Sequence, residues 1–128
     1  MTASQNAALF ATTLLLFLAV FQLLLAAGVP WGRAAWHGAH RVLPKRLRWA
    51  SLAAVPVLLL AGLVVLARSD LVGPGSSPLP IRILAWSFAV FFGLNTVGNL
   101  SSKSSIERWL MTPVAFVLAA CFLAVALS

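Results

Sequence analysis

The fold is decided by the run LLLFLAVF at residues 14–21, in which every side chain is apolar. A half-buried strand would alternate apolar and polar positions, and a helix of a water-soluble domain would keep one polar face. This run does neither, and its apolar character extends over about residues 7–27. About 20 such residues cross the roughly 30 Å hydrocarbon core of a bilayer as one helix, so we expect a membrane span here.

Three further apolar runs of similar length follow, and they predict spans at about residues 49–67, 81–98 and 109–127. Of the 128 residues, 62% are hydrophobic and 9% are charged, whereas about 25% are charged in soluble domains. In lipid, a segment that is apolar on all sides satisfies its backbone internally as a helix. The expected fold class is therefore all-α: an integral membrane four-helix bundle, with residues 1–128 as one transmembrane domain.

The basic residues are unevenly divided between the loops. Of nine lysines and arginines, five lie in the loop at residues 29–48 and two between the third and fourth spans. Cytoplasmic loops of membrane proteins carry an excess of Lys and Arg. We therefore expect both loops in the cytoplasm and both termini outside, in a multi-pass protein of the bacterial cytoplasmic (inner) membrane. Because this topology explains the net charge of +7, nucleic acid is not an expected partner.

The loop at residues 29–48 is also a candidate contact surface. Basic residues beside a membrane attract anionic lipid headgroups by about 1 kcal/mol each, and tryptophan rings favour the same depth. The candidate residues for a lipid or partner surface are Arg33, Arg41, Lys45, Arg46 and Arg48, with Trp31 and Trp36. A short interfacial helix is expected over residues 33–42, between two prolines. The alternative is that this charge only sets the orientation.

A second candidate site is a set of polar residues within the spans: Gln22, Asn95, Thr96 and Asn99. Asn95 and Asn99 are four residues apart and share a helix face. Gln22 is expected at a similar depth, so these side chains are expected to meet. They either join helices by hydrogen bonds of about 0.6–2 kcal/mol or line a polar path or small pocket.

Metal and catalytic sites find little support in the residue pattern. His37 and His40 are three residues apart and are weak candidates for metal or haem ligation, since no Cys or carboxylate lies near them in sequence. The two acids, Asp70 and Glu107, are expected on opposite sides of the membrane. We therefore predict no catalytic residue, no metal and no cofactor.

A weak internal similarity relates the two halves of the chain. The motif AVF at residues 19–21, followed by Leu24 and Gly28, recurs as AVF at residues 89–91, followed by Leu94 and Gly98. This pattern predicts two parallel helical-hairpin repeats. Chance similarity within apolar sequence is the alternative.

Four segments carry a resemblance to a known group: GVPWG at residues 28–32, LPKRLR at 43–48, LNTVGNL at 94–100 and ERWLMTP at 107–113. Together they resemble small four-span bacterial integral membrane proteins. The resemblance covers most of the chain and implies the four-span fold. It implies no activity.

These observations favour a non-enzymatic membrane protein that acts through helix packing with itself, with a partner protein or with anionic lipid. The alternative is a small oligomeric channel or uniporter with a polar path near Gln22, Asn95 and Asn99. A membrane enzyme using His37 and His40 ranks third. Proton-coupled transport is disfavoured because no Asp, Glu, Lys, Arg or His lies in the interior of a predicted span.

Overall fold

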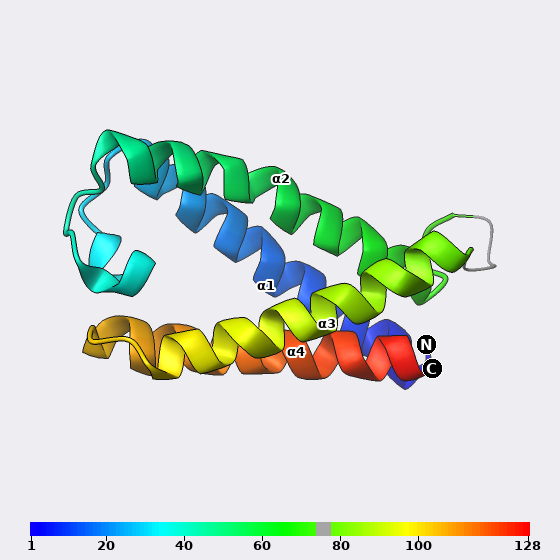
Figure 1. The fold of residues 1–128 in the computed structure, drawn as a ribbon. Coiled ribbons are helices and arrows are strands. Elements are labelled where there is room, and N and C mark those ends of the chain that lie inside the picture. Colours follow the sequence, from blue (N-terminus) through cyan, green and yellow to red (C-terminus); the bar gives the residue numbers. More distant parts are fainter. Residues whose placement is uncertain (74–77) are drawn as a thin grey trace.

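The computed structural model describes residues 1–73 and 78–128. Its long helices are α1 (Ala3–Ala26), α2 (Lys45–Arg68), α3 (Leu79–Leu100) and α4 (Thr112–Leu127), shown in Figure 1. A π-helical turn, η3 (Glu107–Met111), runs directly into α4, and two short 3-10 turns, η1 (Gly32–Ala34) and η2 (Trp36–Gly38), lie between α1 and α2.

The prediction of an all-α chain with four membrane-spanning helices is confirmed. The four helical segments contain 21 to 24 residues each and are long and apolar enough to cross a membrane, so the chain is a multi-pass membrane protein. The predicted spans agree with these helices to within four residues at each end. The helices are longer where polar residues continue them beyond the apolar run, as at Lys45 in α2.

The helix ends near the two termini are joined by polar contacts. Thr2 Oγ1 accepts a hydrogen bond from the backbone N–H of Gln5 at 3.1 Å, and Gln5 Oε1 accepts one from the N–H of Thr2 at 3.2 Å. This capping box starts α1 at Ala3. The Gln5 side chain also donates to the carbonyl of Ser69 at 3.3 Å, beside the end of α2. Both chain termini lie at this end of the bundle (Figure 1).

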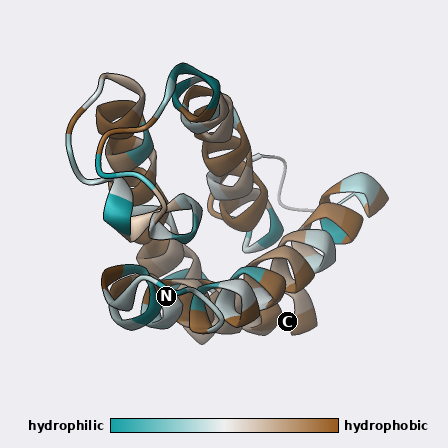
Figure 2. Ribbon diagram, turned by 60° about the vertical axis from the view of Figure 1, so that its left-hand side comes forward, coloured by the Kyte–Doolittle hydropathy of each residue, from teal (hydrophilic) through white to brown (hydrophobic). Residues whose placement is uncertain are grey.

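The helices form two antiparallel hairpins, α1 with α2 and α3 with α4, and α1 also packs against α4. Contact between α2 and α3 is much sparser. In Figure 1 the hairpins approach each other near the termini and separate toward the opposite end, where η1 and η2 lie. Figure 2 shows hydrophobic residues along most of each helix and hydrophilic residues mainly near helix ends and in loops.

The buried core combines alanines and branched aliphatic residues from the four helices with aromatic rings on α3 and α4. Phe122 is fully buried, with its ring centroid 5.2 Å from that of Phe92 and 5.9 Å from that of Phe88. Large side chains such as Phe17 and Phe116 are exposed on the outside of the bundle. Because lipid is as apolar as these side chains, dispersion contacts between closely packed helices hold such a core together.

The loop between α1 and α2 differs from the short interfacial helix expected over residues 33–42. Ala35 is extended, with φ −143° and ψ 166°, and it separates η1 from η2. Trp36 and His37 both have positive φ. The loop also folds back on itself, since the N–H of Gly32 donates to the carbonyl of Arg41 at 2.8 Å. A Cβ at Gly32 would lie 2.3 Å from the carbonyl oxygen of His40, so this close approach requires glycine. Tertiary contacts therefore override the local helical pattern.

Candidate functional site: a cavity between the hairpins

A cavity of about 580 Å³ lies between the two hairpins, on the side where α2 and α3 have few contacts. Its lining comes from α1 (Leu18, Phe21, Gln22), the loop (Ala34, Ala35, Trp36), α2 (Ala50, Ala53, Ala54, Val57, Leu58), α3 (Phe91, Phe92, Asn95, Asn99), η3 (Glu107, Met111) and α4 (Ala115, Leu118). Three of the residues on α2 are alanines within little more than one turn, and such short side chains leave the space unfilled.

The polar residues expected to meet inside the membrane lie mostly on this cavity. Gln22, Asn95 and Asn99 line it, whereas Thr96 is not among the lining residues. The Thr96 hydroxyl donates to the carbonyl of Phe92 at 2.8 Å, within its own helix. Asn95 likewise donates to the carbonyl of Phe91 at 3.0 Å. Both side chains therefore form their hydrogen bonds within α3, and these bonds do not join α3 to another helix.

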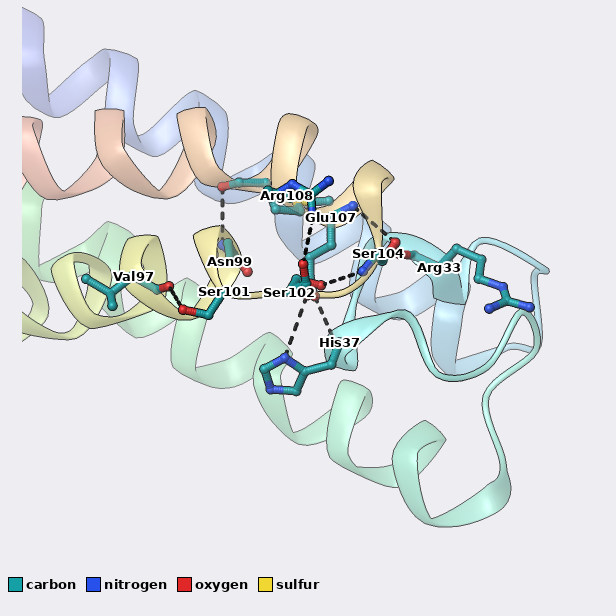
Figure 3. A network of polar contacts seen from close by, with 10 residues as sticks. Arg33, His37, Val97, Asn99, Ser101, Ser102, Ser104, Glu107 and Arg108 are labelled. Atoms are coloured by element: carbon teal, nitrogen blue, oxygen red, sulfur yellow. Dashed lines mark hydrogen bonds and ion pairs between the residues drawn. The ribbon is translucent and has the colours of Figure 1, made fainter.

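Asn99 makes a contact between elements, because its Nδ2 donates to the carbonyl of Met111 in η3 at 3.3 Å (Figure 3). A π-helical turn is wider than an α-helical one and often occurs at functional sites. Here it places both Glu107 and Met111 on the cavity. Gln22 differs from Asn99, since its Oε1 is buried and has no hydrogen-bond donor.

Glu107 is the buried carboxylate of the site. Its side chain is 6% exposed, and Oε2 accepts a hydrogen bond from the backbone N–H of His37 at 3.3 Å. Its Oε1 lies 4.0 Å from His37 Nδ1 and accepts no hydrogen bond. Figure 3 shows His37 and Glu107 facing each other from two loops far apart in sequence. An unpaired buried carboxylate oxygen is costly, so this position is suited to a donor from outside the chain.

Glu107 was not expected near the histidines, and the structure corrects that expectation. The sequence offered no nearby carboxylate, yet folding brings one to His37 across 70 residues of chain. One signal was present: Glu107 is the single acid among seven bases in the two loops predicted to be cytoplasmic, and it begins an apolar run. An acid there needs a structural or functional reason.

The two loops around Glu107 are joined by further polar contacts. The Ser104 hydroxyl donates to the carbonyl of Arg33, and the Ser104 N–H donates to Ser102 Oγ at 3.1 Å. Gly38 has φ +69°, and a Cβ there would lie 2.2 Å from the Cβ of Ser104. Glycine at position 38 thus permits the close approach of the loops and supplies the required backbone conformation.

Trp36 lies on the cavity and contacts α2. Its indole N–H donates to Ser51 Oγ at 2.9 Å, and Ser51 is fully buried. The hydrogen bond holds the ring over the cavity and gives the buried hydroxyl a partner. Trp31, which was grouped with Trp36 as a candidate of the lipid or partner surface, is exposed and does not line the cavity.

The basic candidates of this surface divide into exposed and engaged residues. Arg41, Lys45 and Arg46 are exposed. Arg33 is also exposed and donates to the carbonyl of Gly38 at 3.0 Å. Arg48 is half-buried, and its Nε donates to the carbonyl of Ala26 at 2.9 Å, at the end of α1. A cation at this position donates a hydrogen bond to a carbonyl at the end of the helix and interacts favourably with the helix dipole. Arg48 is therefore part of the scaffold.

The histidines are both exposed, and within the described residues the imidazole of His37 has one carboxylate neighbour, Glu107, at 4.0 Å. Within residues 1–73 and 78–128, no group of three His, Cys, Asp or Glu side chains could hold a metal ion. Asp70 follows α2 at the end of the bundle near the termini, whereas Glu107 lies at the opposite end (Figure 1).

No protein-family model, curated protein or solved structure matches this chain. The chemistry of the site therefore has to be inferred from the cavity itself. That cavity is mostly apolar, with amide and carboxylate oxygens toward one end. Such an arrangement suits binding of a molecule that has a polar head and an apolar body.

Proposed function

We propose that this chain is a non-enzymatic multi-pass membrane protein that binds an amphipathic molecule from the bilayer in the cavity between its hairpins. The main support for this proposal is the cavity of about 580 Å³. Sites for drug-sized ligands occupy about 300–1,000 Å³, are lined mainly by apolar and aromatic groups, and contain a few polar groups that orient the ligand.

The distribution of polarity along the cavity supports this proposal. Trp36 and Glu107 lie at the loop end of the bundle, whereas Leu58 and Leu118 are buried near the middle of their helices. A molecule with its head at the membrane interface and its tail in the hydrocarbon has the same polarity profile. An amphiphile can therefore enter without moving its head out of the interface.

Orientation and location form part of the proposal. We place both termini outside, in a bacterial inner membrane, because seven of the nine lysines and arginines lie at one end of the bundle, in two loops or in the helical turns next to them. The exposed residues Arg41, Lys45 and Arg46 then face the anionic headgroups of the inner leaflet. Contacts with a second copy or with a membrane-protein partner, and a parallel relation between the hairpins, stay predictions from sequence.

Tryptophan fluorescence tests the proposal, with 3-bromododecanol as the probe, because its bromine lies beside the head group and Trp36 lies at the head-group end of the cavity. A bromine atom quenches tryptophans that it contacts, so the protein is reduced to one tryptophan by replacing the others with Phe. A form that keeps only Trp36 should show saturable quenching in proteoliposomes, because Trp36 lines the cavity. A form that keeps only Trp86, exposed on α3, should show only the gradual quenching caused by probe dissolved in the lipid.

A blocking substitution supplies the control. Ala54→Phe fills the cavity from α2 and should abolish saturable quenching of Trp36. Ala120→Phe adds the same ring at an exposed position on α4 outside the cavity and should leave the quenching unchanged. The proposal fails when Trp36 is quenched no more strongly than Trp86, or when Ala54→Phe makes no difference.

A second candidate function is the oligomeric channel or uniporter, which is favoured by one observation. Gln22, Asn95 and Asn99 line the same cavity from two helices. A conducting pathway would use these amides, so ion or solute flux into proteoliposomes should disappear in Asn95→Leu and survive neutralisation of Arg41, Lys45 and Arg46. Absence of flux with a range of small ions and solutes removes this candidate.

A further inference from the structure

We infer that the cavity recognises a primary ammonium group carried on a single apolar chain, and that the carboxylate of Glu107 receives it. The inference rests on the proposed binding function and deepens it by naming the chemistry of the head group. Two buried side-chain oxygen atoms on residues of the cavity lining have unmet hydrogen-bonding capacity.

The first is Glu107, whose carboxylate is incompletely paired. The backbone N–H of His37 occupies Oε2, but Oε1 has no donor. The His37 imidazole is 4.0 Å from Glu107 Oε1, beyond hydrogen-bond distance, and the His37 side chain is 76% exposed. A carboxylate buried to this degree is stable only with an opposite charge and further hydrogen bonds. The Glu107 carboxylate, which belongs to the cavity lining, therefore has unmet capacity for a cation that donates hydrogen bonds.

The second is Gln22, whose buried Oε1 also has no donor and which lines the same cavity. Both unmet positions are oxygen acceptors, so a fitting ligand must bring donors. A primary ammonium carries three N–H donors together with a positive charge, and hydrogen bonds between charged groups are about twice as strong as neutral ones. A hydroxyl head group supplies one donor and no charge. A trimethylammonium head group supplies the charge and no donor.

The charges around the cavity agree with a cationic head. Among the described residues that line it, Glu107 alone is charged. The nearby guanidinium groups of Arg33 and Arg108 donate to the carbonyls of Gly38 and Ser102, each at 3.0 Å, and neither residue lines the cavity. A divalent metal ion would need more ligands, and the described part of the chain provides no group of three. An organic cation is the better match.

The position of Glu107 decides how the rest of the molecule lies. Glu107 begins the fourth membrane-spanning segment, so an ammonium bound there sits at the depth of the lipid headgroups. The apolar lining then continues toward Leu58 and Leu118, deeper in the bundle. A cavity of drug-like size accommodates one apolar chain, and this leads to a single-chain amine.

Three probes that carry the bromine on the same carbon, close to the head group, test the inference on the protein that keeps only Trp36: 3-bromododecylamine, 3-bromododecyltrimethylammonium and 3-bromododecanol. Near neutral pH the amine is protonated, as a lysine is. We expect half-maximal quenching of Trp36 at about a tenfold lower concentration of the amine than of either other probe. Equal concentrations for the three probes would overturn the ammonium inference.

Glu107→Gln supplies the second measurement. The glutamine keeps an oxygen that can accept from the N–H of His37 but removes the charge, so the amine should bind about tenfold more weakly, whereas binding of the uncharged 3-bromododecanol should change much less. Asp70→Asn removes the other acid, which is exposed at the opposite end of the bundle, and should change nothing. Unchanged binding of the amine to a folded Glu107→Gln protein contradicts the inference.

The outcomes separate this inference from the function on which it rests. When 3-bromododecanol quenches Trp36 saturably and Ala54→Phe abolishes that quenching, but the amine has no advantage, the binding cavity stands and the ammonium inference falls. When no probe quenches Trp36 saturably, both fall. If Glu107→Gln does not fold, the comparison of the three probes on the parent protein decides the matter.

Discussion

The carboxylate of Glu107 accepts a hydrogen bond from the backbone N–H of His37 at 3.3 Å, across 70 residues of chain. This contact joins the loop of the first hairpin to the start of η3 in the second. It lies where the hairpins have separated, so it ties them together beside the cavity. The same carboxylate is thus both a structural tie and the charged group of the candidate site.

The contact between the loops should depend on glycine at position 38. Gly38→Ala introduces a Cβ 2.2 Å from that of Ser104 and imposes a positive φ on an alanine. Strain and overpacking of this kind cost about 1–3 kcal/mol each. We expect a lower thermal unfolding midpoint in mild detergent. Gly93→Ala is the matched control, since a Cβ there meets nothing within 4 Å, and an equal loss in both variants would contradict the close approach.

The hydrogen bond from Trp36 to Ser51 should show as an energetic coupling. Trp36→Phe removes the donor and leaves a fully buried hydroxyl, at a cost of about 1 kcal/mol. After Ser51→Ala the same tryptophan substitution should cost little. A double-mutant cycle measured by unfolding in detergent should therefore give a coupling energy of about 1 kcal/mol. Additive effects of the two substitutions would mean that the bond does not form.

Arg48 should contribute to stability more than its neighbour of equal charge. Its Nε donates to the carbonyl of Ala26, where α1 ends. Arg48→Ala should lower the free energy of unfolding by about 1–2 kcal/mol, because the carbonyl loses a charged donor. Arg46→Ala, at an exposed position, should change stability by less than about 0.5 kcal/mol. Similar losses in the two variants would indicate a general effect of charge.

Phe122 should be the more sensitive of two phenylalanines on α4. Phe122 is fully buried among the rings of Phe88 and Phe92, whereas Phe116 is 63% exposed on the outside of the bundle. Phe→Ala in a water-soluble core costs about 3–5 kcal/mol. In lipid the transfer of the ring out of water contributes little to folding. We therefore expect Phe122→Ala to lower the free energy of unfolding by less than in a water-soluble core, and Phe116→Ala to leave it almost unchanged. Unfolding in detergent measures both, and a larger effect at Phe116 would contradict the packing.

The proposed orientation predicts which loop is reached from outside the cell. With Cys121→Ser as background, Ala39→Cys and Val72→Cys place single thiols at exposed positions at opposite ends of the bundle. A membrane-impermeant maleimide applied to intact cells should label Val72→Cys and spare Ala39→Cys until the cells are lysed. Labelling of Ala39→Cys alone in intact cells would reverse the orientation.

Much of the fold could be predicted because each span is a local property of the chain. The run at residues 14–21 is enough to require a helix in lipid, whatever the other helices do. The helix boundaries were less certain, since the capping of α1 by Thr2 and Gln5 and the continuation of α2 to Lys45 occur where the apolar pattern has ended. The polar set could be proposed in part, because Asn95 and Asn99 share a helix face by their spacing alone.

The remainder of the site could not be predicted in this way. A short helix was expected over residues 33–42, between two prolines, but Trp36 and His37 have positive φ, and this segment contacts the start of η3. These contacts turn Trp36 toward Ser51 and bring His37 to Glu107. Neither pairing leaves a pattern in the sequence, since each depends on how the loop between α1 and α2 folds against α2 and against η3.

The amino-acid sequence alone dictates four apolar helices and an uneven distribution of positive charge, because the transfer of each segment into lipid depends on its own side chains. The tertiary structure decides that α2 and α3 remain apart, that Gln22, Asn95 and Asn99 line one cavity, and that Glu107 lies there with an unpaired oxygen. These features depend on packing between segments distant in sequence. Apolar helices in lipid offer many similar surfaces for that packing, so small side chains and a few polar contacts select among them.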